Sequence, residues 1–90
     1  MAYEFRWNDW NLAKCAKHGV RFEEAEFVVN HARAPFPRRL ENQKILVKGQ
    51  SGVGRYLQVI YLLEQDDVVF VIHARGLNDN EKRQLRRRRR

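Results

Sequence analysis

The sequence contains little of what builds disulfide-bonded or metal-binding proteins. Its 90 residues include one cysteine, one methionine and two prolines. A single cysteine forms no internal disulfide, so the fold must depend on its hydrophobic core. Such a low cysteine content is typical of proteins in a reducing compartment. Three scattered histidines and one cysteine match no familiar metal-ligand spacing. We therefore expect neither a bound metal nor a cofactor.

Long apolar runs are also absent. The longest ones, at 59–63 and 68–72, have five residues each, whereas a membrane-spanning helix needs about 20. The first residues, MAYEFR, lack the apolar segment of a secretory signal. We expect a cytoplasmic protein with no membrane partner. The chain also has no Walker phosphate loop and no GxSxG nucleophile elbow, which argues against two common enzyme classes.

Positive charge is abundant but unevenly placed. The formal net charge is +7, and Arg86–Arg90 supply five of these positive charges. Subtracting five from seven leaves a net charge of +2 on residues 1–85. Such an Arg-rich tail attracts phosphate backbones, because binding releases their counterions. It also suits an acidic protein partner, or it is a solvated end that aids solubility. Composition alone leaves these three interpretations open.

The chain length predicts a single domain of residues 1–90. The pattern of the first half predicts one strand and two helices. Alternating apolar and charged residues predict a strand at 3–7. Polar capping residues then introduce a helix over about 9–18, and Gly19 is the expected stop. A second helix begins at 22, and prolines predict an extended connection at 34–37.

The second half changes to the pattern of strands. Segments 43–48, 55–63 and 68–75 are rich in apolar residues and are joined by short polar or glycine-containing turns. This arrangement predicts an antiparallel meander. Asn78, followed three residues later by Glu81, resembles a capping box that opens a last, basic helix.

These elements predict an α+β fold with an antiparallel sheet of about four strands. The two N-terminal helices most simply cover one face of that sheet. The other face then stays open, as a binding cleft or a partner surface. The basic C-terminal helix has only Leu85 to anchor it in a core.

The strand at 68–75 carries the most suggestive pair of polar residues. His73 exchanges a proton near neutral pH, and Arg75 can hold a phosphate with two hydrogen bonds. Cleavage of RNA at a 2′-hydroxyl needs a base, an acid and a phosphate clamp, although a surface pair is the commoner role for such residues. Strand alternation assigns Phe70, Ile72 and Ala74 to the core side, and Val69, Val71, His73 and Arg75 to the other.

Four further residues have plain structural interpretations. Arg55 follows a glycine-containing turn and either reaches a phosphate or is an ordinary charge at a strand start. His18 is better explained as a helix-end cap than as a catalytic group. His31 reads as a solvated residue at a helix end, and Cys15, among alanines, as a small buried filler.

Taken together, four segments resemble the BrnT-like toxin family, of the RelE-type class. They occur in the family's order and span nearly the whole chain. They are Trp7–Leu12 (WNDWNL), Lys17–Glu26 (KHGVRFEEAE), Gly54–Ile60 (GRYLQVI), and Val71–Arg75 (VIHAR) followed by Glu81–Arg83 (EKR).

The resemblance implies a RelE-like fold and an endoribonuclease activity that reduces translation. It also implies a BrnA-like antitoxin partner, which binds DNA and forms a hetero-oligomer with the toxin. By position, Arg55, Arg75, Glu81 and Arg83 match the family pattern, and His73 stands beside them as a catalytic candidate. The candidates for RNA binding are Lys44, Lys82, Arg86, Arg87, Arg88, Arg89 and Arg90.

The chain departs from the family pattern at three positions. Leu85 stands where relatives often have tyrosine, His73 where they have serine or threonine, and Asn8 where aspartate is common. Leucine has no hydroxyl for proton transfer. Two alternatives to an active ribonuclease stay open, and this change favours the first of them. One is a non-catalytic module that binds nucleic acid, and the other is a protein that only binds an antitoxin-like partner.

Overall fold

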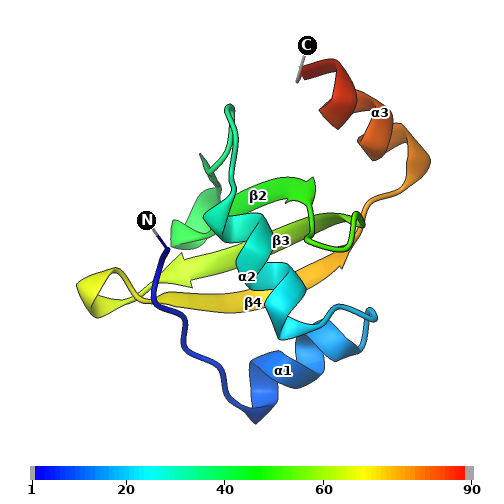
Figure 1. Ribbon diagram of the computed structural model, residues 1–90. Helices are drawn as coiled ribbons and strands as arrows, with labels where there is room; N and C mark the ends of the chain where they lie inside the picture. The colour runs from blue at the N-terminus through cyan, green and yellow to red at the C-terminus, as the bar shows by residue number, and fades with distance from the viewer. Residues whose placement is uncertain (1, 89–90) are drawn as a thin grey trace.

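The structure, a computed structural model, describes residues 2–88. Within them it has an α+β fold with three α-helices and one antiparallel sheet, whose strand order is β1-β2-β3-β4 (Figure 1). The helices are α1 (Asp9–Ala16), α2 (Phe22–Asn30) and α3 (Asp79–Arg88), and the strands are β1 (Arg38–Arg39), β2 (Ile45–Gln50), β3 (Tyr56–Leu63) and β4 (Val69–Gly76). The predicted α+β class and antiparallel meander are confirmed.

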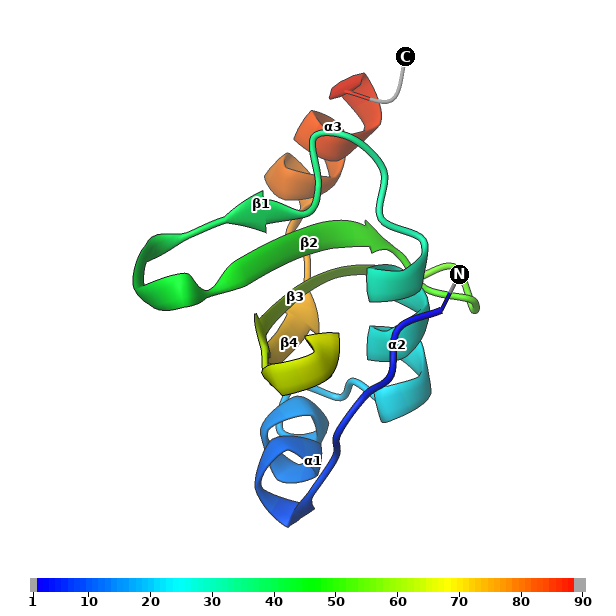
Figure 2. The ribbon, with the colours of Figure 1, turned by 90° about the vertical axis from the view of Figure 1, so that its left-hand side faces the viewer.

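The three helices lie on different sides of the sheet. Helix α2 packs against β2 and β3 on one face, while α1 lies beside β4 at one edge and α3 lies near β1 and β2 at the other (Figures 1 and 2). The expectation that both N-terminal helices cover the same face is therefore wrong for α1. None of the helices within residues 2–88 is both long and apolar enough to cross a membrane.

Helix α1 begins at Asp9, as predicted, and ends at Ala16, two residues before the predicted end at 18. Asn8 caps it, since its side chain accepts a hydrogen bond from the Asn11 amide while the Asn11 side chain accepts one from the Asn8 amide. Gly19 then adopts a φ of +70°, which a residue without Cβ tolerates. Asn11 is fully buried and also donates to the Arg6 carbonyl. These contacts fix how α1 enters and leaves the fold.

The N-terminal segment at 3–7 is not a strand of the sheet, which corrects the sequence prediction. Only Phe5 forms a bridge, parallel, to Val69 at the start of β4, because the chain turns at Asn8 into α1. The fourth strand is instead β1, Arg38–Arg39, which pairs with Leu46 and Ile45 of β2. Two exposed arginines show no apolar alternation, so the pattern gave no signal for them.

The predicted faces of β4 are also partly wrong. Val69, Val71 and Ala74 are fully buried, whereas Phe70 and Ile72 are half-buried. The reason is a β-bulge. His73 pairs with Ile60, but Val71 pairs with the next residue, Tyr61, so Ile72 is the extra residue and the alternation changes there.

The hydrophobic core lies between α2 and the sheet and extends to α1 and α3. Cys15 is 1% exposed, as expected for a buried filler, and burial raises the pKa of its thiol to about 11. Leu85 is 4% exposed and anchors α3, as the sequence predicts. The core consists of Cys15, Val20, Ala25, Val28, Val29, Phe36, Ile45, Leu46, Val47, Leu57, Val59, Tyr61, Val69, Val71, Ala74, Leu77 and Leu85.

Candidate functional site

The sheet face turned away from α2, here called the outer face, carries a row of polar residues. Lys48 of β2 pairs with Gln58 of β3, which pairs with Arg75 of β4. His73 lies two residues before Arg75 and is half-buried. The strand is regular from His73 to Arg75, after the bulge, so the two residues lie on the same face, as the sequence predicts.

Glu81, from the first turn of α3, completes this row. Its two carboxylate oxygens accept hydrogen bonds from Nη1 and Nη2 of Arg75 at 2.9 and 2.8 Å. Lys48 Nζ lies 3.9 Å from the same carboxylate, so two cations face one anion. Arg75 also donates to the Gln58 side chain and the Gly76 carbonyl. Most of its donors are therefore engaged, and an incoming phosphate would compete with Glu81.

Glu81 also fixes the start of α3. Its amide donates to the Asn78 side chain at 2.8 Å, and its carboxylate accepts from the Asn78 amide at 2.9 Å. The predicted capping box is thus confirmed. Hydrogen bonds from Arg75 and from the Asn78 backbone lower the pKa of Glu81 to about 2.

We expect Glu81→Gln to destabilise the protein by about 2 kcal/mol near neutral pH, because hydrogen bonds to a charged group are lost. The native state binds this proton less tightly than the unfolded chain does. The stabilisation is therefore complete above the ordinary glutamate pKa of about 4.3 and is lost as the pH falls towards about 2. Urea unfolding of both proteins at several pH values measures this difference.

Asp79→Asn is the matched control, since Asp79 lies in the same first turn of α3. Its side chain is 89% exposed and is 3.9 Å from Lys82, so its removal should change the stability little at any pH. The free energy of unfolding should differ less between Glu81→Gln and the wild type as the pH falls. A difference that stays constant down to the lowest pH would contradict the assigned role of Glu81.

Two histidines from distant parts of the sequence meet beside this row. The rings of His18, after α1, and His73, in β4, have centroids 5.4 Å apart and are inclined at 64°. Burial lowers the pKa of His73, and the charges of His18, Arg75 and Lys14 lower it further. His73 is thus neutral near pH 7, the form that accepts a proton. The sequence interpretation of His18 as a helix cap missed this pairing.

Arg55 lies apart from these residues. Its side chain donates to the Gly19 carbonyl at 2.8 Å and to the Glu24 carboxylate at 3.1 Å, on the α2 side of the sheet. Glu24 is 8% exposed and also accepts hydrogen bonds from the Ser51 hydroxyl and the Arg21 amide. Arg55 therefore joins the β2–β3 turn to the α1–α2 connection, and the structure does not bring it to His73.

The remaining predicted residues are spread over the surface. Arg83 is exposed on α3, and Lys44 is exposed just before β2. Lys82 lies 3.9 Å from Asp79, and the Arg86 guanidinium lies 5.7 Å from the ring centre of Tyr56. Arg87 is exposed. The side chain of Arg88 and the whole of Arg89 and Arg90 lie outside the described residues.

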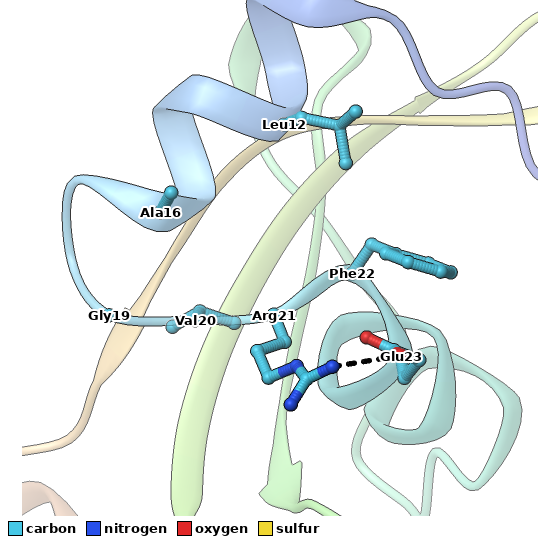
Figure 3. A pocket seen from close by; sticks show the side chains of 7 residues that line it. All are labelled: Leu12, Ala16, Gly19, Val20, Arg21, Phe22 and Glu23. Atoms are coloured by element: carbon cyan, nitrogen blue, oxygen red, sulfur yellow. Dashed lines mark hydrogen bonds and ion pairs between the residues drawn. The ribbon is translucent and has the colours of Figure 1, made fainter.

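An apolar groove of about 360 Å³ lies between α1 and α2 (Figure 3). Leu12, Ala16 and Phe22 line it, and an ion pair between Arg21 and Glu23 lies at its side. It contains none of the predicted catalytic or RNA-binding residues. Glu23 is the one carboxylate in its lining, and it is paired with Arg21 at 3.4 Å.

Comparisons of the chain with models of protein families, with curated proteins and with solved structures found no match. The resemblance to BrnT-like toxins therefore stays a prediction from the residues.

Proposed function

We propose that the protein is an endoribonuclease whose active site is the outer face around His18 and His73. The observation that carries this proposal is the meeting of the two imidazoles 5.4 Å apart. They lie beside Arg75, on a face where Lys48 and Arg75 outnumber the single carboxylate of Glu81. Paired proton carriers next to excess positive charge are what phosphodiester transfer requires.

The reaction is transfer at the 2′-hydroxyl of RNA. His73 takes the proton from the 2′-hydroxyl, and the 2′-oxygen forms a bond to phosphorus. The bond from phosphorus to the 5′-oxygen breaks, and His18 gives that oxygen a proton. The products are a 2′,3′-cyclic phosphate and a 5′-hydroxyl. Two imidazoles supply both proton transfers, so the mechanism requires no metal or cofactor.

The environments of the two histidines assign their roles. His73 is the base, because its lowered pKa keeps it unprotonated near pH 7. His18 lies in the exposed turn after α1 and is the acid. Arg75 is held in place by Glu81 and Gln58 and adds fixed positive charge near the reacting phosphate.

The biological role we propose is that of the toxin in a type II toxin–antitoxin pair. The four family-like segments support this role, together with an α+β arrangement compatible with a RelE-like fold. In that setting the protein acts on RNA in the cytoplasm, lowers translation, and is held inactive by a BrnA-like antitoxin in a hetero-oligomer.

The test is cleavage of RNA by the purified protein in the presence of a metal chelator. The wild type should cleave, and a His18→Ala, His73→Ala double variant should not. His31→Ala is the matched control, because His31 stacks on Phe27 with ring centres 3.9 Å apart, at the end of α2. Equal cleavage by the double variant and the wild type would refute the proposal.

One observation favours a second function, the binding of RNA without cleavage. Glu81 and Gln58 occupy much of the hydrogen-bonding capacity of Arg75, and Leu85 points into the core instead of offering a tyrosine hydroxyl. A folded wild-type protein that binds RNA tightly but leaves it intact would establish this second function.

A further inference from the structure

Helix α1 presents a flank of aromatic and basic residues along β4. Residues four apart on a helix share a flank, so Trp10 and Lys14 lie in line, and His18 continues that line just after the helix. Asn11 and Cys15 form the neighbouring buried line that attaches α1 to the core. His18, one of the two proposed catalytic histidines, lies at one end of this flank.

The other end of the flank is a stack of rings and cations. Trp10 is 50% exposed and stacks on Phe70 of β4, with ring centres 5.9 Å apart and an interplanar angle of 12°. The guanidinium of Arg6, which also pairs with Glu64 at 2.7 Å, lies 4.1 Å from the Phe70 ring centre. The Lys14 ammonium lies 5.3 Å from the ring centre of Trp10. Trp10 is thus held flat by Phe70 while half of it faces solvent.

The flank leads directly to the histidine pair. His18 is eight positions after Trp10, which at the rise of a helix corresponds to about 12 Å. Along this length, an exposed ring, a lysine and the histidines follow one another. Single-stranded RNA is recognised by this combination, since its unpaired bases stack on aromatic rings and its phosphates attract cations. The bases of a duplex are already stacked on each other and are closed to Trp10.

We propose that Trp10 is the stacking platform for an unpaired base in a single-stranded RNA track that runs along α1 to His18 and His73. The inference rests on the proposed RNA function and names its substrate class. An incoming base takes the position over Trp10 that Lys14 now occupies, and the flexible lysine moves to the adjoining phosphate. A duplex or an acidic peptide has phosphates or carboxylates but no unpaired base to stack.

The test measures binding of a labelled, 2′-O-methylated single-stranded oligonucleotide of about 10 nucleotides by fluorescence anisotropy. This RNA lacks the 2′-hydroxyl and stays intact, so binding is read separately from cleavage. Trp10→Ala should weaken binding by about 10-fold or more, and Trp10→Phe should weaken it less. Leu12→Ala, on the opposite flank of α1 and 38% exposed in the wild type, should bind like the wild type.

An abasic oligonucleotide of the same length isolates the stacking. Trp10→Ala and the wild type should bind it equally, and their thermal unfolding should confirm that both are folded. Unchanged binding of the methylated RNA by Trp10→Ala, or an equal loss on the abasic strand, would overturn the proposal. Tight binding of polyglutamate with the same dependence on Trp10 would overturn it in favour of an acidic protein partner. In each case RNA cleavage by the wild type would still test the proposed function.

Discussion

Replacing His73 with glutamine is expected to lower the rate constant for RNA cleavage by about 100-fold or more, the usual contribution of a positioned general base. The pH dependence should change as well. In the wild type, activity should fall as the pH drops through the pKa of His73, which lies below the ordinary histidine value because of burial and of His18, Arg75 and Lys14. The variant should lose this decrease in activity at low pH, the acid limb of the pH profile. Rates measured over a range of pH test both statements.

Two comparisons separate a catalytic from a structural role of His73. Thermal unfolding of His73→Gln should match that of the wild type, since glutamine keeps a polar side chain of similar length. Lys14→Ala removes one of the charges that lower the pKa of His73, so its acid limb should move to higher pH while cleavage persists. An acid limb that survives in His73→Gln would show that another group is the base.

The largest effect on stability is expected for Glu24→Ala. Glu24 is 8% exposed and accepts hydrogen bonds from Arg55, Ser51 and the Arg21 amide. Its removal leaves the Arg55 guanidinium and the buried Ser51 hydroxyl without this partner, which should cost about 3 kcal/mol. For a domain of this size, the expected decrease in Tm is about 15 °C. Calorimetry or urea unfolding measures it.

The neighbouring Glu23→Ala is the matched control. The Glu23 side chain is 54% exposed and pairs with Arg21 at 3.4 Å, so its loss should change the stability by less than about 0.5 kcal/mol. Arg55→Ala should resemble Glu24→Ala in stability while a folded sample keeps its cleavage rate. Equal effects of the two glutamate substitutions would contradict the network around Glu24. A selective loss of cleavage in folded Arg55→Ala would return Arg55 to the active site.

Much of the fold could be predicted because local chemistry determines it. The Asn8 cap, the Gly19 stop and the Asn78–Glu81 capping box are visible in short stretches of sequence and are confirmed. The β4 faces could not be predicted, because the bulge at Ile72 depends on pairing with β3. Strand β1 depends in the same way on β2, since its two arginines have no strand pattern of their own.

The candidate site shows the same division between local and tertiary information. Strand spacing placed His73 with Arg75, and the last helix offered Glu81. The meeting of His18 with His73 depends on how α1 packs beside β4, which no local pattern reveals. The resemblance predicted Arg55 as a site residue, but Arg55 pairs with the buried carboxylate of Glu24. Glu24 reads in the sequence as an ordinary helix-start residue.

The most direct test of the central claim is cleavage of an oligoribonucleotide and of the same oligonucleotide with 2′-deoxyribose at the cleaved position, with the product ends identified by mass spectrometry. We expect that only the ribose form is cut in the presence of a metal chelator, and that the fragments end in a 2′,3′-cyclic phosphate and a 5′-hydroxyl. Cleavage of the deoxyribose form, or fragments with a 3′-hydroxyl and a 5′-phosphate, would contradict transfer at the 2′-hydroxyl by His73 and His18.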